Sequence, residues 1–129
     1  MRFEDMDVWK KASRLSVSIY RELADLKDFG FKDQITRSGL SIPSNIAEGF
    51  GRSSDKEKRN FLNYAKGSCA ELRTQAYIGM EIGYISRDAN RNFIILTDGY
   101  APGQMAWYLA CCITLSVGFQ PGSPRNYRE

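Results

Sequence analysis

The segment from Ser54 to Ile85 carries the longest helical pattern in the chain, and it constrains the fold more than any other feature. Ser54 and Glu57 match the capping box that opens many helices, in which the two side chains satisfy free backbone N–H groups. Apolar and small residues then recur at steps of three and four along two neighbouring stripes. Such a helix is about 45 Å long, at ~1.5 Å per residue. Because it needs long partners to cover its buried face, the segment favours a helical bundle.

Two shorter helical patterns precede this segment. Residues 7–26 place apolar side chains at steps of three and four, and Gly30 is suited to end that helix. Residues 31–50 carry a second apolar stripe, which contains Pro43. Since proline removes a helical hydrogen bond, we expect a kink near Ser41, or a break there into two short helices.

The last third of the chain has a weaker helical pattern. Ser86 can cap a fourth helix, but the apolar residues 93–96 stand in a row and turn residues follow them. After about residue 90 we therefore expect an atypical fourth helix or a tail. A chain of 129 residues is the size of one domain. We expect this domain to cover residues 1–118, with a loose tail over residues 119–129.

The chain contains no histidine, which removes the commonest general base and every histidine-dependent triad or zinc site. Its three cysteines do not form a disulfide framework, because two of them are adjacent. We therefore expect a non-enzymatic protein without metal or cofactor. The N-terminus lacks an apolar signal region, and the longest apolar run, residues 105–115, is shorter than the ~20 residues that span a bilayer. This predicts a cytoplasmic protein that does not enter membranes.

The net charge of +3, from 18 Lys and Arg against 15 Asp and Glu, permits a nucleic-acid partner without requiring one. The candidate phosphate contacts are Lys10, Lys11, Arg14, Arg21, Arg37, Arg52, Lys56 and Arg59. The alternative is that these side chains are simply solvated. Arg52 also stands beside the start of the long helix, where backbone N–H groups can hold an anion or simply form a turn. In an oligomer each modest patch would be repeated, so that phosphate contacts would add.

A more specific signal spans residues 41–53, which read Ser-Ile-Pro-Ser-Asn-Ile-Ala-Glu-Gly-Phe-Gly-Arg-Ser. With Gln34 and Arg37 ahead of it, this segment resembles the signature of proteins encoded in intervening sequences of 23S ribosomal RNA. The resemblance covers about residues 3–88. It implies an all-α, up-and-down four-helix bundle that associates into rings, with a pentamer favoured. It also implies a fold similar to the accessory proteins of diversity-generating retroelements, which bind nucleic acid.

The resemblance includes a line of polar residues, and those within residues 31–50 share one helix face. The line consists of Gln34, Arg37, Ser41, Asn45, Glu48, Glu71 and Gln75. One interpretation is a solvated face or hydrogen bonds between helices, and the other is a subunit contact or a ligand surface. For Asn45 and Glu48 we favour a structural network or a bond between subunits.

Three interpretations of function remain open at this point, and the absence of histidine and of any nucleophile–base spacing argues against the third, an enzyme. The first is an oligomeric binding protein that associates with RNA. The second is a protein–protein scaffold or adaptor that does not bind nucleic acid. The first predicts salt-sensitive RNA binding, because contacts with phosphates release counterions, whereas the second predicts an apolar or mixed groove for a protein partner.

Overall fold

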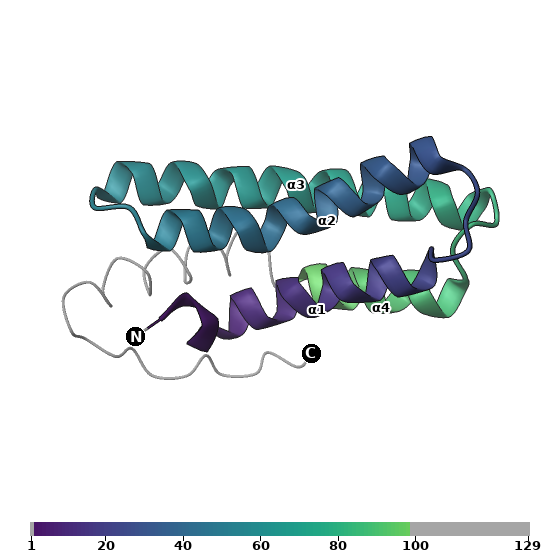
Figure 1. The fold of residues 1–129 in the computed structure, drawn as a ribbon, viewed down its shortest axis with the longest axis horizontal. Coiled ribbons are helices and arrows are strands. Elements are labelled where there is room, and N and C mark those ends of the chain that lie inside the picture. Colours follow the sequence, from purple (N-terminus) through teal and green to yellow (C-terminus); the bar gives the residue numbers. More distant parts are fainter. Residues whose placement is uncertain (1, 99–129) are drawn as a thin grey trace.

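A computed structural model describes residues 2–98 of the chain. These residues form a short 3-10 helix and four α-helices: Phe3–Asp5, α1 (Asp7–Glu22), α2 (Phe29–Phe50), α3 (Asp55–Glu81) and α4 (Arg87–Asp98). The α-helices run alternately in opposite directions, and each packs against its two neighbours in cyclic order (Figure 1). Residues 2–98 contain no strand. The predicted all-α, up-and-down four-helix bundle is therefore confirmed.

The core lies between the four helices and is built from the predicted apolar stripes. Leu15 and Ile19 of α1, Ile35 of α2 and Leu72 of α3 are each fully buried, and Phe93 of α4 is nearly so. Fully burying one such side chain stabilises the fold by about 1.5–3 kcal/mol. The apolar faces of all four helices therefore hold the bundle together.

The first helix is shorter than its apolar pattern. α1 ends at Glu22 rather than near Leu26, although Leu23 is almost fully buried and Leu26 packs against the core. The side-chain ammonium group of Lys32 donates a hydrogen bond of 3.0 Å to the carbonyl of Ala24, within the turn that follows. The stripe continues past the helix because it reports which side chains are buried, whether or not the backbone is helical.

The second helix begins at Phe29, so the prediction that Gly30 ends the preceding helix is wrong. Gly30 lies in the first turn of α2. The carboxylate of Asp28 accepts a hydrogen bond of 3.1 Å from the backbone N–H of Phe31. Asp28 is therefore the N-cap of α2, in the role that aspartate commonly takes at helix starts.

Pro43 lies inside α2 without breaking it, so the predicted alternative of two short helices is wrong. The helix runs through as one element that changes direction along its length (Figure 1). The Ser44 hydroxyl donates to the carbonyl of Leu40 at 2.8 Å, and the Asn45 amide donates to the carbonyl of Ser41 at 2.8 Å. Both side chains bond to carbonyls in the turn that contains Pro43, and back-bonding of this kind is associated with bent helices.

A specific capping contact sets each end of α3. The Ser54 hydroxyl accepts the N–H of Glu57 at 3.2 Å, which is one half of the predicted capping box, whereas the Glu57 carboxylate bonds to the Ser54 hydroxyl. At the other end Gly83 has φ +83°, and the N–H of Tyr84 reaches the carbonyl of Gly79 at 2.8 Å. This is a Schellman motif, which ends a helix at a residue in the left-handed region. α3 therefore stops at Glu81, before the predicted end at residue 85.

Residues 87–98 form the fourth helix, so the bundle extends to Asp98. Ser86 caps it as predicted, because its hydroxyl accepts the N–H of Ala89 at 3.1 Å. The helix is atypical in burying two polar residues, Asn90 and Thr97, beside Phe93. Within residues 2–98, the side-chain oxygen of Asn90 is a buried polar atom without a hydrogen-bond partner. The apolar run 105–115 and the predicted tail 119–129 lie outside the described residues.

Candidate nucleic-acid interface and the seam between α2 and α3

Three basic residues gather on the N-terminal half of α1, and they form what we term the α1 basic patch: Lys10, Lys11 and Arg14. The buried side of α1 carries Val8 and Leu15, which leaves the patch on the opposite side. Lys11 and Arg14 are exposed, and Lys10 is half-buried. None of the ion pairs found among residues 2–98 uses these three side chains. The patch can therefore meet a phosphate without first breaking an ion pair.

Lys56 and Arg59 are exposed on the first turns of α3. The N-termini of α1 and α3 lie at the same end of the bundle, because both helices run in the same direction (Figure 1). The structure thus brings Lys56 and Arg59 to the end that holds the α1 basic patch, although on a different helix. Arg21 lies further along α1, where it is exposed and lines a groove described below.

The other two candidate arginines are engaged within the subunit. Arg37 contacts Asp33 with an N–O distance of 3.0 Å. Arg52 pairs with Glu48 and also lies over the ring of Phe61, 4.7 Å from its centroid. The sequence does not indicate that Phe61 contacts Arg52, since the two residues belong to different elements. Both arginines would have to leave a partner in order to bind a phosphate.

The start of α3 is a weaker anion site than the sequence indicates. The Ser54 hydroxyl donates to the Glu57 carboxylate at 2.8 Å, in addition to accepting its N–H. Asp55 is a second acidic residue in the same turn. Because these carboxylates already place negative charge at the helix N-terminus, they oppose a phosphate there.

The polar line predicted from the sequence follows the seam between α2 and α3. The Ser68 hydroxyl of α3 donates to the Ser41 hydroxyl of α2 at 2.8 Å. The Asn45 amide donates to the same hydroxyl at 2.9 Å. Ser41 and Asn45 therefore belong to a hydrogen-bonded crosslink between two helices. Ser68 completes it from α3.

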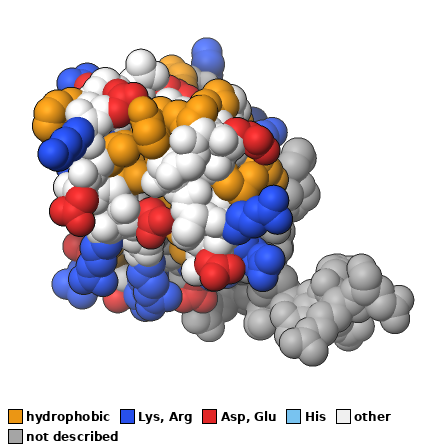
Figure 2. Space-filling view, turned by 90° about the vertical axis from the view of Figure 1, so that its right-hand side faces the viewer, with side chains coloured by type: hydrophobic (Ala, Val, Ile, Leu, Met, Phe, Trp, Pro, Cys, Tyr) orange, Lys and Arg blue, Asp and Glu red, His pale blue; other side chains and the backbone are white. Residues whose placement is uncertain are grey.

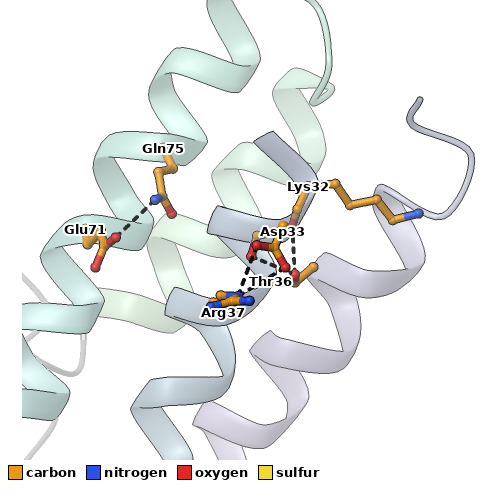
Figure 3. A network of polar contacts seen from close by, with 6 residues as sticks. All are labelled: Lys32, Asp33, Thr36, Arg37, Glu71 and Gln75. Carbon is orange, nitrogen blue, oxygen red and sulfur yellow. Dashed lines mark hydrogen bonds and ion pairs between the residues drawn. The ribbon is translucent and has the colours of Figure 1, made fainter. Parts of the chain in front are cut away.

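A second crosslink lies further along the same seam. The Ser38 hydroxyl donates to the Gln75 side-chain oxygen at 2.7 Å, and the Gln75 amide donates to Glu71 at 3.3 Å. Figure 3 shows Glu71 and Gln75 on α3, next to the Asp33–Arg37 pair on α2. The contacts within each helix are separate, and the bond from Ser38 to Gln75 is the one that links the two helices at this point of the described residues. Gln34, at the start of the line, is exposed.

An apolar groove that sequence reasoning missed lies between α1 and α2, and we term it the α1–α2 groove. It has a volume of about 500 Å³, and Val17, Tyr20, Leu40 and Pro43 line it together with Arg21. Val17, Tyr20 and Leu40 are each between 44% and 47% exposed, which is high for large apolar side chains. The available signal was that Val17 and Leu40 fall outside the apolar stripes of their helices.

Two further kinds of site were sought among residues 2–98. No group of three or more Cys, Asp or Glu side chains is placed there to hold a metal ion. None of the helices in this part of the chain is both long enough and apolar enough to cross a membrane.

Comparison with known proteins identifies one family. Residues 4–100 match the family model described as "23S rRNA-intervening sequence protein". The match runs about ten residues past the end of the resemblance seen in the sequence, and it therefore includes α4. A search of curated proteins finds no match.

Proposed function

Because this chain belongs to the family of 23S rRNA-intervening sequence proteins, we propose that it is a non-enzymatic, cytoplasmic binding protein that associates with RNA. We further propose that it forms a homo-oligomer, with a ring of five favoured. The family's description ties its members to the intervening sequences of 23S rRNA, so RNA of that kind is the first ligand to test.

The α1 basic patch is the observation that carries the RNA proposal. Lys10, Lys11 and Arg14 share one side of a helix, away from the core and outside the ion pairs of the described residues. Each subunit of a ring would present one copy of this patch. The net charge of +3 per chain would become about +15 in a ring of five, and contacts with phosphates would add.

A binding role without catalysis is supported by the side chains that the chain offers. It has no histidine to act as a general base near neutral pH. Within residues 2–98, the polar side chains of the α2–α3 seam bond to one another between helices. Hydroxyl and amide groups that satisfy each other in this way stabilise the bundle, and they contain no pairing of a nucleophile with a base.

The α1–α2 groove favours a second candidate function, a protein–protein scaffold or adaptor without nucleic-acid binding. Its exposed Val17, Tyr20 and Leu40 offer an apolar surface. Apolar patches of this kind mark sites of contact with other proteins. This function requires no salt-sensitive contact with RNA, and so the two candidates can be separated by one experiment.

The experiment measures RNA binding by fluorescence anisotropy over a range of salt concentrations. The probes are a labelled transcript of a 23S rRNA intervening sequence and an unrelated transcript of equal length. We expect the wild-type protein to bind more weakly as salt rises. The variant Lys10→Glu/Lys11→Glu/Arg14→Glu should lose binding, and a variant that only neutralises the three charges should lower the salt slope by about two per subunit.

The matched control reverses three exposed charges elsewhere, at Lys27, Arg87 and Arg91. It makes the same change in net charge, so it should weaken binding far less if the α1 basic patch is the contact surface. Equal losses in both variants would assign binding to overall charge rather than to the patch. Absence of binding by the wild-type protein at the lowest salt would leave the scaffold as the better account.

A further inference from the structure

We infer that the α1–α2 groove of one subunit receives α3 of a second copy, through what we term the α3 ridge: Ile78, Glu81 and Ile82. The inference deepens the proposed function and rests on the proposed ring, because it names the two faces that would join its subunits. These faces belong to different helices, so the contact is heterologous, and a repeated heterologous contact generates a ring when the rotation closes.

The α3 ridge is an apolar surface that the subunit's own core leaves uncovered. Ile78 is 51% exposed and Ile82 is 54% exposed, and the two residues lie one turn apart. They stand close to the C-terminal end of α3. Figure 2 looks at this end of the bundle and shows hydrophobic side chains exposed among charged ones. Two aliphatic side chains on adjacent turns match a shallow groove lined by Val17, Tyr20 and Leu40.

The direction of the helices agrees with such a contact. α1 and α3 run in the same direction within one subunit (Figure 1). Rotation about an axis parallel to the bundle preserves that direction, so α1 of one subunit would meet α3 of the next in parallel. The contact would therefore need no change in the orientation of either helix.

Both faces lie towards the same end of the bundle. A closed ring is built by rotation without translation, so its contacts join residues at equal heights along the bundle. The N–H of Ser86, just after α3, donates to the carboxylate of Glu22 at the end of α1, at 3.3 Å. This bond places the end of α1 beside the turn that follows α3, at the end of the bundle towards which both the groove and the ridge lie.

Among the registers that this spacing allows, the positions of the charges select one. Val17 and Arg21 are one turn apart, as are Ile78 and Ile82, so Val17 can lie level with Ile78 while Arg21 lies level with Ile82. Glu81 is then about 1.5 Å from the height of Arg21. Arg21 and Glu81 are both exposed, and neither takes part in an ion pair among residues 2–98. The rim of the groove and the ridge thus carry opposite charges.

The test compares Arg21→Glu, Glu81→Arg and the double variant with the wild-type protein. Light scattering on a sizing column gives the mass of the assembly, and so its number of subunits, over a range of concentrations. Each single reversal places like charges together, and we expect it to weaken assembly by roughly tenfold or more. The double variant restores an opposite pair with reversed polarity, so it should recover most of the assembly. Arg91→Glu, on the exposed side of α4, is the matched control and should assemble like the wild-type protein.

The outcomes separate this inference from the proposed ring. If the wild-type protein forms a ring and both single variants form it equally well, the inference is overturned and the ring remains. If the single variants dissociate and the double variant does not recover, the pairing of Arg21 with Glu81 is overturned. If the wild-type protein is a monomer at every concentration, the proposed ring and this inference both fall. Far-ultraviolet circular dichroism of each variant shows whether the bundle is intact.

Discussion

The hydroxyl of Tyr84 donates a hydrogen bond of 2.9 Å to the carboxylate of Asp28, and it thereby ties together the two turns at one end of the bundle. Asp28 follows α1 and caps α2, whereas Tyr84 follows α3. The ring of Tyr84 also packs edge-on against Phe31, with 5.3 Å between centroids. One bond therefore joins the two halves of the bundle at the point where the chain reverses in both.

This bond makes stability depend on pH at both extremes. The N–H of Phe31, and then the Tyr84 hydroxyl, hold the pKa of Asp28 below its ordinary value of 3.8. The bond to Asp28 raises the pKa of Tyr84 above 10.0. The contribution of Asp28 is lost as pH falls through its lowered pKa, and that of Tyr84 is lost as pH rises through its raised pKa. Between those limits the bond is intact.

We predict that Tyr84→Phe lowers the melting temperature at neutral pH, because it removes the hydrogen bond while keeping the aromatic contact. The difference from the wild-type protein should shrink in acid, once Asp28 is protonated. Thermal melts followed by circular dichroism across this pH range provide the measurement. Tyr77→Phe, at an exposed tyrosine of α3, serves as the control. A Tyr84→Phe difference that is the same at every pH would contradict the role given to Asp28.

Two glycines of α3 should respond in opposite ways to alanine. A Cβ at Gly79 would lie 2.7 Å from Ile85 and 2.8 Å from Phe31, whereas a Cβ at Gly67 would meet nothing within 4 Å. We predict that Gly67→Ala stabilises the protein by about 0.5–1 kcal/mol, through helix propensity alone. Gly79→Ala should destabilise it, because overpacking costs about 1–3 kcal/mol and exceeds that gain. Chemical denaturation measures both changes, and a stabilising Gly79→Ala would show that the contact with Ile85 yields easily.

The crosslink between Ser41 and Ser68 should appear as an energetic coupling. A double-mutant cycle of Ser41→Ala and Ser68→Ala should give a coupling free energy of about 0.5–1.5 kcal/mol, as for one hydrogen bond between helices. Ser44 bonds only to the carbonyl of Leu40 within its own helix. A cycle that pairs Ser44→Ala with Ser68→Ala should therefore be additive. Additivity in both cycles would show that the seam is held by apolar packing alone.

The helices could be predicted from the sequence, whereas several of their ends could not. Apolar spacing indicates which side chains are buried. The apolar pattern of α1 therefore includes Leu23 and Leu26, although the helix ends at Glu22. The ends depend on single local features, such as the side-chain cap from Asp28 and the left-handed backbone of Gly83. The fourth helix was the hardest to predict because two polar residues, Asn90 and Thr97, occupy buried positions on its apolar face.

Candidate site residues could be named from the sequence, but their partners could not. Helical spacing was enough to place Ser41 and Asn45 on one face of α2. That face meets α3 only because of how the two helices pack, so the bond from Ser68 had no signal in the sequence. The α1–α2 groove could not be predicted either, because Tyr20 and Leu40 belong to different helices and meet only in the folded bundle.

The proline inside α2 has a consequence for how the protein folds. Without an N–H at Pro43, the carbonyl of Gly39 receives no hydrogen bond from the next turn of the helix. Helix growth is cooperative, so α2 on its own would tend to separate into two segments too short to persist in water. The bonds from Ser38 to Gln75 and from Ser68 to Ser41 fall on either side of Gly39 and tie both segments to α3. The continuity of α2 therefore depends on its docking against α3 as well as on its own hydrogen bonds.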